Sequence, residues 1–341
     1  MSKTVLVTGG TGFVGAHIIF QLLQKGYNVK TTLRSISAKD KVIYTLEANG
    51  ITNFDNLAFV EADLSKDDNW DAAMEDCDYV LSVASPVFMN IPKDENEAMQ
   101  PAINGIIRIL KAARNASIKR VVMTSNFGAI GFSNKNPNTI TTEADWTDPK
   151  EKGLSVYEKS KLLAESAAWD FIKKEGAGLE FVTINPVAIL GPALSDHISG
   201  SFGILQHLID GSMKRVPNIP LNVVDVRDVA DLHIRAMTNP HANGQRFLAS
   251  EDGQISMPEI AALLRNKKPD VAKKVSTKTI PNEFINLAAL FNKQAKEAAL
   301  LLRINRKVSN EKAKKILGWT PISNNEEAIL ASIDSMMKFG I

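Results

Sequence analysis

The stretch Thr4–Gly15, with the sequence TVLVTGGTGFVG, decides the fold of this 341-residue chain. Its apolar run Val5–Val7 is typical of a buried parallel strand, and glycines follow at positions 9, 12 and 15. Helical spacing of apolar residues begins at Val14. A strand, a glycine-rich turn and a helix in this order predict a dinucleotide-binding turn, in which free N–H groups at the helix N-terminus bind a pyrophosphate.

Each glycine of this turn has a separate expected role. Gly9 allows a sharp turn off the strand, Gly12 allows backbone N–H groups to approach the pyrophosphate, and Gly15 allows close packing of the helix on the strand. An isolated glycine motif is often a plain strand-to-helix turn, but the strand before it and the helix after it favour dinucleotide binding. The residues of the turn that we expect to contact the cofactor are Gly9, Thr11, Gly12, Phe13 and Val14.

The composition is ordinary for a globular protein, with 44% hydrophobic and 23% charged residues. The formal net charge of +2 gives no reason to expect nucleic acid or an anionic membrane as a partner. Cys77 is the only cysteine, which excludes an internal disulfide and indicates a reducing compartment. Met1–Lys3 leads directly into the first strand, and no apolar run approaches the ~20 residues that span a bilayer. We therefore expect a cytoplasmic protein without a membrane partner.

Strand signals alternate with helical ones over the first half of the chain. The six expected strands are Val5–Val7, Tyr27–Leu33, Leu57–Ala62, Tyr79–Val83, Val121–Ser125 and Leu179–Ile184. This alternation predicts an α/β fold with a doubly wound parallel (Rossmann) sheet.

Past Pro186 the alternation loosens. Short strands are expected over Leu221–Asp228 and Gln245–Ser250, and helices over Asn282–Leu302 and Glu326–Phe339. We expect residues 1–186 plus about 221–250 to form an NADP-binding Rossmann domain. Residues 187–220 plus 251–341 are expected to form a smaller, mostly helical C-terminal lobe that binds the substrate.

The end of the second strand indicates which dinucleotide is bound. Arg34 stands where an acidic residue would bind the ribose 2′-hydroxyl of NAD, and its planar, charged donor group suits the 2′-phosphate of NADP. A solvated basic loop is the alternative for a lone arginine. With no acidic residue at that strand end, we favour NADP, supplied as NADPH.

Further cofactor contacts are expected where the later strands end. Asp63 and Leu64 follow the third strand and could frame the adenine, although Asp63 could instead cap the next turn. The small residues at the mouth of the fourth strand would admit a flat cofactor, or form an ordinary proline-terminated loop. The positions concerned are Ala84, Ser85 and Pro86 after the fourth strand, and Thr124 near the end of the fifth.

Tyr157 and Lys161 are four residues apart inside a helical pattern, so they lie on one face of a helix. A phenol has an unperturbed pKa near ~10, and a neighbouring ammonium is expected to lower it. The lysine could also bind the cofactor ribose. A YxxxK spacing alone is usually a solvated helix face, but the glycine-rich turn at the start of the chain favours a catalytic pair.

Together these motifs resemble those of the extended short-chain dehydrogenase/reductase family, and within it the dihydroflavonol-reductase-like aldehyde and ketone reductases. The stretches that carry the resemblance are Thr8–Gly15, Arg34, Asp63-Leu64, Ala84–Pro86, Tyr157–Glu165, Asn185-Pro186, Val224–Ala230 and Val308–Pro321. The resemblance implies that Tyr157 gives a proton to a carbonyl and that Lys161 tunes it and binds ribose. It also implies that Pro186 and Val187 contact the nicotinamide side.

One position departs from the family pattern. The family usually has Thr-Ser-Ser after the fifth strand, and the second serine polarises the substrate carbonyl, whereas this chain has Thr124-Ser125-Asn126. The amide of Asn126 can donate a hydrogen bond in that role. Ser125 could supply a hydroxyl instead if the turn is shifted by one residue, or neither residue acts.

Two further patterns limit the assignment. The chain has Leu154-Ser-Val-Tyr157-Glu158 where cinnamoyl-CoA reductases have an Asn-Trp-Tyr-Cys signature, so the acyl-CoA branch is disfavoured. The five histidines show no metal-ligand spacing, and we expect no metal.

The sequence therefore predicts an NADPH-dependent reductase that converts a small-molecule aldehyde or ketone to the alcohol. One alternative is a nucleotide-sugar epimerase or dehydratase with bound NAD, against which Arg34 argues. Another is a regulator that binds NADP without turnover, for which Asn126 is the only support. The sequence does not separate a monomer from a homodimer.

Overall fold

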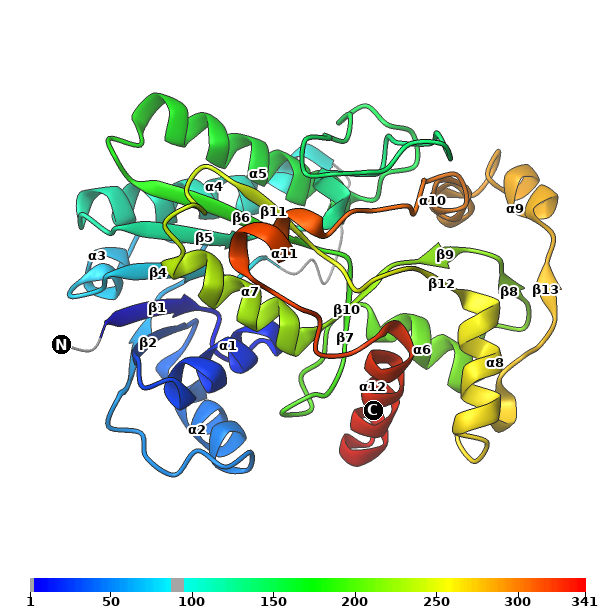
Figure 1. The fold of residues 1–341 in the computed structure, drawn as a ribbon, viewed down its shortest axis with the longest axis horizontal. Helices are drawn as coiled ribbons and strands as arrows, with labels where there is room; N and C mark the ends of the chain where they lie inside the picture. Colours follow the sequence, from blue (N-terminus) through cyan, green and yellow to red (C-terminus); the bar gives the residue numbers. More distant parts are fainter. Residues whose placement is uncertain (1–2, 87–94) are drawn as a thin grey trace.

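The computed structural model describes residues 3–86 and 95–341, and its centre is a seven-stranded sheet (Figure 1). Its strands are β1 (Thr4–Thr8), β2 (Asn28–Leu33), β3 (Leu57–Glu61), β4 (Tyr79–Ser82), β5 (Arg120–Thr124), β6 (Glu180–Pro186) and β11 (Arg246–Ala249). They lie in the order β11-β6-β5-β4-β1-β2-β3, and every neighbouring pair is parallel. The six expected strands and the doubly wound fold are confirmed, and β11 comes from the stretch expected at Gln245–Ser250.

Helices cover both faces of this sheet (Figure 1). One face packs on α1 (Phe13–Gln24), α2 (Lys39–Glu47) and α7 (Val226–Thr238). The other face packs on α3 (Trp70–Met74), α4 (Glu95–Asn115) and α5 (Val156–Glu175). Successive residues of β1 show why the strands are almost entirely apolar. Val5 and Val7 join the first core and Leu6 joins the second, because side chains alternate between two buried faces.

A second lobe follows β6 and has its own apolar core. Its helices are α6 (Phe202–Ile209), α8 (Met257–Lys267), α9 (Asn282–Ala288), α10 (Lys293–Leu301) and α12 (Asn325–Phe339). Its short strands are β7 (Ala188–Leu190), β8 (Val216–Pro217), β9 (Pro220–Leu221), β10 (Val223–Asp225), β12 (Ile255–Ser256) and β13 (Thr279–Ile280). They pair as β10-β7 near the centre of Figure 1, and as β12-β9 and β13-β8 at its right. Helix α11 (Glu311–Leu317) returns to the large sheet and contacts β11 and α7.

Two expected elements were wrong in extent. The strand expected over Leu221–Asp228 is divided, since Leu221 ends β9 and β10 pairs with β7 outside the large sheet. The strand stops at Asp225 because that side chain accepts a hydrogen bond from the N–H of Arg227 and begins α7. The helix expected over Asn282–Leu302 is two helices. Asn292 is extended and its side chain accepts a hydrogen bond from the N–H of Ala295, which starts α10 afresh.

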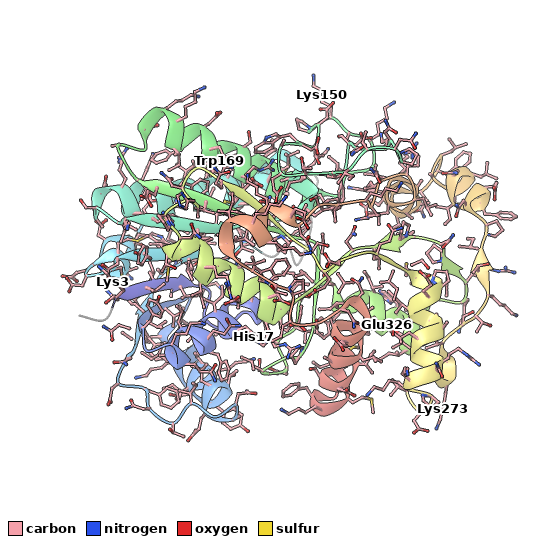
Figure 2. All side chains as sticks on the ribbon, in the orientation of Figure 1. Lys3, His17, Lys150, Trp169, Lys273 and Glu326 are labelled. Atoms are coloured by element: carbon pink, nitrogen blue, oxygen red, sulfur yellow. The ribbon has the colours of Figure 1, made fainter. Side chains whose placement is uncertain are left out.

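The two lobes meet along α1. His17, labelled in Figure 2, is buried, and its Nε2 lies 2.8 Å from the carbonyl oxygen of Pro192. The ring of Phe13 packs edge-on against Phe202 of α6 at 5.3 Å between centroids. None of the helices described by the structure has the length and apolar character needed to cross a membrane.

Candidate active site

The glycine-rich turn between β1 and α1 has the geometry of a phosphate cradle. Gly9 has a φ of +78°, which favours glycine, and a Cβ on Gly15 would lie 2.3 Å from the Gly9 carbonyl oxygen. Gly12 is the N-cap of α1 and has no side chain that could cap the helix. The first N–H groups of α1 are therefore not bound by a capping side chain and can bind an anion. The turn therefore fits a dinucleotide pyrophosphate. Contacts from Thr11, Phe13 and Val14 stay predictions.

At the far end of the expected cofactor site, Arg34 is exposed directly after β2. Its guanidinium makes no hydrogen bond or ion pair with any residue of the described ranges, so it is available to a phosphate. Asp63 accepts hydrogen bonds from the N–H and the hydroxyl of Ser65, both at 2.8 Å. The backbone hydrogen bond from Ser65 lowers the pKa of Asp63, with smaller contributions from the Ser65 hydroxyl and from the charges of Lys66 and Arg34. This geometry agrees with the turn-capping alternative for Asp63.

A small cavity that opens to solvent lies where β4 and β5 end, against α4 and α5. It brings together six of the expected cofactor residues, which are Leu64, Ala84, Ser85, Pro86, Thr124 and Lys161. The hydroxyl of Thr124 is engaged elsewhere, since it lies 2.7 Å from Nε2 of His233, whose Nδ1 lies 2.7 Å from a backbone carbonyl. The Thr124 hydroxyl is therefore not available to a ligand in this cavity, and Thr124 borders the cavity mainly with its main chain.

Pro186 and Val187 lie at the carboxyl end of β6, next to β5. The N–H of Val187 donates to the carbonyl oxygen of Ala249 at 3.1 Å, which ties this segment to β11. The segment is thus on the edge of the sheet where the glycine-rich turn also lies. Its contact with a nicotinamide stays a prediction.

Tyr157 and Lys161 lie in the first turns of α5. The helix starts sharply because Ser155 and Glu158 form a reciprocal capping box. The Tyr157 side chain is 49% exposed and its hydroxyl makes no hydrogen bond with a residue that the structure describes. Lys161 is buried, with Nζ 6.0 Å from the centre of the Tyr157 ring and donating to the Thr124 carbonyl oxygen at 3.3 Å.

The charge states of this pair differ from the expectation. Partial burial, and then the neighbouring carboxylate of Glu158, raise the pKa of the Tyr157 phenol to about 12. Burial lowers the pKa of Lys161 to about 8, while the carboxylate of Glu165 opposes that change. The expected lowering of the phenol pKa was wrong for the protein by itself, because burial and the Glu158 carboxylate both raise the pKa of Tyr157. At neutral pH the phenol holds its proton and the lysine is largely charged.

The two residues that could polarise a carbonyl lie in different surroundings. Ser125 is buried, and its hydroxyl donates to the carboxylate of Glu165 behind the strand end. The side-chain amide of Asn126 makes no hydrogen bond within residues 3–86 and 95–341, and its Oδ1 atom is buried without a partner. Of the two, Asn126 is free to donate, whereas Ser125 would first have to leave a buried carboxylate.

Three residues that sequence reasoning did not single out for a role complete the site. Glu165 and Arg246 form a buried ion pair, with Arg246 Nε 2.7 Å from Glu165 Oε1, and Asn185 donates to Glu165 Oε2 at 2.7 Å. The available signal was the spacing of Glu165, four residues after Lys161 and so on the same face of the helix. Nothing local in the sequence pointed to Arg246, which is 81 residues further along.

Comparison with known proteins identifies the family of the chain. The model of the 3-beta hydroxysteroid dehydrogenase/isomerase family matches residues 6–253. An uncharacterised oxidoreductase of Schizosaccharomyces pombe is 35% identical over 311 residues, which are 85% of this chain and 91% of the relative. Cinnamoyl-CoA reductase 1 of Arabidopsis thaliana is 36% identical over 251 residues, which are 72% of this chain and 70% of that one.

Among solved structures, the yeast methylglyoxal/isovaleraldehyde reductase Gre2 complexed with NADPH has a TM-score of 0.81. It is 26% identical, and the alignment covers 99% of each chain. The chain belongs to the 3-beta hydroxysteroid dehydrogenase/isomerase family, within the extended short-chain dehydrogenases/reductases and their dihydroflavonol-reductase-like group.

Proposed function

We propose that this protein reduces an aldehyde or ketone to the alcohol with NADPH. The observation that carries the proposal is the placement of three side chains at the carboxyl edge of the sheet. Tyr157 and Lys161 lie on α5, with Lys161 lining the cavity, and Asn126 lies shortly after the end of β5. NADPH, when bound, supplies the hydride that adds to the carbonyl carbon. The protein's own residues supply the proton and hold the carbonyl oxygen.

Tyr157 is the proton donor in this proposal. Its raised pKa keeps the phenol protonated at neutral pH, as an acid requires, and its hydroxyl has no competing partner among the described residues. The charge of Lys161 stabilises the phenolate that remains after proton transfer and can also bind the ribose hydroxyls. The amide of Asn126 donates a hydrogen bond to the carbonyl oxygen, where negative charge develops.

NADPH is favoured over NADH by the exposed guanidinium of Arg34 after β2, which has no partner among the described residues and suits a 2′-phosphate. The same choice is supported by one relative of known structure, Gre2, which was solved with NADPH.

The test follows NADPH absorbance with a panel of aliphatic and aromatic aldehydes and ketones. Tyr157→Phe is expected to lower kcat by at least ~100-fold. The control is Tyr27→Phe, since Tyr27 precedes β2 at the opposite edge of the sheet and should leave kcat unchanged. Equal rates for Tyr157→Phe and the parent protein would rule the mechanism out.

Three other outcomes would favour different functions. Because one relative is a cinnamoyl-CoA reductase, the panel includes an aromatic acyl-CoA, and turnover of that compound alone would favour the acyl-CoA branch. Protein that purifies with bound NAD⁺ and shows no net NADPH oxidation would favour an epimerase or dehydratase. Binding of NADPH without turnover of any compound would favour a regulator.

A further inference from the structure

Glu165 is fully buried inside the Rossmann domain, on the face of α5 that packs against the sheet. Each of its carboxylate oxygens is bound by groups from several elements. Oε1 accepts from Arg246 Nε at 2.7 Å, Thr183 Oγ1 at 3.1 Å and Trp169 Nε1 at 3.3 Å, and Oε2 accepts from Asn185 Nδ2 at 2.7 Å and from the Ser125 hydroxyl. Trp169 is labelled on α5 in Figure 2. A buried carboxylate with this many donors holds those donors in place.

The donors on Oε2 fix the backbone on which Asn126 stands. Ser125, the preceding residue, is held by its hydroxyl to Glu165 and by its N–H to the carbonyl oxygen of Ile184 at 2.8 Å. Asn185 donates from one amide nitrogen both to Glu165 and to the carbonyl oxygen of Asn126 at 3.2 Å. The Glu165 carboxylate therefore holds this segment at both ends, directly through the Ser125 hydroxyl and indirectly through Asn185, which binds the Asn126 carbonyl oxygen. The side chain of Asn126 takes no part in these contacts.

The same carboxylate acts on Lys161. Glu165 lies one helical turn beyond Lys161, and its negative charge favours the charged form of the lysine against the effect of burial. The cavity walls around Lys161 from β4, β5 and α4 carry no titratable group among the described residues, so Tyr157 and Glu165 are the titratable neighbours that face it.

Arg246 links this network to the loop that precedes α5. Its guanidinium donates to the carbonyl oxygens of Glu143 at 2.9 Å and Asp145 at 2.7 Å, and lies 3.7 Å from the centre of the Trp146 ring. The arginine thus pairs with the buried Glu165 carboxylate and ties it to the loop before α5.

We propose that Glu165 is the positioning residue of this site. It holds the Ser125–Asn126 segment so that the carbonyl-facing donor is the Asn126 amide, and it keeps Lys161 charged. The inference rests on the proposed function for the roles of Asn126 and Lys161. It also explains why a chain with a serine at position 125 uses its neighbour, since that hydroxyl is already bound to a buried carboxylate.

Glu165→Gln tests the proposal, because it keeps the size of the side chain and removes the charge. The alkaline pH at which kcat falls by half is expected to move down by about 1 pH unit, since Lys161 loses its charge earlier. The loss of NADPH affinity at alkaline pH, followed by NADPH fluorescence, is expected to move by the same amount. Glu165→Asp, which restores the charge, is expected to return both midpoints toward the parent values while kcat stays below that of the parent.

The matched control is Glu180→Gln, which breaks the ion pair of Glu180 with the buried Arg120 where β5 and β6 begin, at the opposite edge of the same strands. This control is expected to lower the unfolding temperature without moving either pH midpoint. Unchanged midpoints in Glu165→Gln would overturn the proposal. If that variant does not fold, Glu165→Asp decides, and a kcat equal to that of the parent would overturn it.

The two proposals can fail separately. If the parent protein reduces no carbonyl compound, the proposed function fails. The pH dependence of NADPH binding still measures the effect of Glu165 on Lys161.

Discussion

Ser125 and Asn126 are adjacent, but alanine at the two positions is expected to act differently. Asn126→Ala should lower kcat and spare the folding stability, whereas Ser125→Ala should lower the folding stability and largely spare kcat. The Asn126 amide makes no hydrogen bond among the described residues, so Asn126→Ala removes no internal hydrogen bond of that side chain. Removal of one donor from a developing oxyanion costs about 3–4 kcal/mol, or 10²–10³ in kcat. Ser125→Ala instead removes a hydrogen bond to a buried charged group, which costs about 1.5–3 kcal/mol of folding free energy.

Two assays on both variants separate these effects. NADPH oxidation with the best carbonyl substrate is expected to show kcat lower by at least ~100-fold in Asn126→Ala and lower by less than ~10-fold in Ser125→Ala. Denaturant unfolding is expected to show a clear loss of stability in Ser125→Ala and less than ~0.5 kcal/mol in Asn126→Ala. Asn126→Ser is the matched control, because the usual family residue should keep most of the activity. The reasoning is refuted if Ser125→Ala loses kcat by ~100-fold while Asn126→Ala does not.

Three further predictions concern the cofactor site and the junction of the lobes. Arg34→Ala is expected to weaken NADPH binding by about 10–100-fold and NADH binding by less than threefold, because only NADPH has the 2′-phosphate. Fluorescence titration measures both affinities, and equal losses would contradict this role. Gly15→Ala is expected to weaken NADPH binding at least ~10-fold in the same titration, since its Cβ would lie 2.3 Å from the Gly9 carbonyl oxygen, and unchanged binding and stability would contradict the close packing. Burial, and then the nearby Asp228 carboxylate, raise the pKa of Glu251 to about 8, so the folded state binds an extra proton above the unfolded pKa of ~4.3. This contribution to stability is complete below pH ~4.3 and is lost as the pH rises to about 8. Glu251→Gln is therefore expected to reduce the fall in unfolding free energy over that pH range by more than about 1 kcal/mol. An unchanged fall in the variant would contradict this prediction.

The parallel sheet could be predicted from the sequence because its signals are local. The apolar run Val5–Val7 and the glycines after it are physical requirements of a buried strand and of a turn that approaches a phosphate. The same local reasoning failed where a single side chain interrupts a pattern. Asn292 is one residue in a helical stretch, yet its capping hydrogen bond divides Asn282–Leu302 into two helices.

The Tyr157–Lys161 pair could also be predicted, since a spacing of four places two side chains on one helix face. Its charge states could not, because they depend on burial and on which carboxylates lie nearby. The choice between Ser125 and Asn126 stayed open in the sequence for a similar reason. It depends on Glu165, which is 40 residues away from Ser125 and meets it only in the folded chain.

The most direct measurement is a crystal structure with NADP⁺ and a bound, unreactive carbonyl compound. We expect the Tyr157 hydroxyl and the Asn126 amide nitrogen each to lie within about 3.2 Å of the carbonyl oxygen above the nicotinamide, with the Ser125 hydroxyl still on Glu165. A Tyr157 hydroxyl directed away from the nicotinamide ring, or a Ser125 hydroxyl on the carbonyl oxygen, would contradict the account.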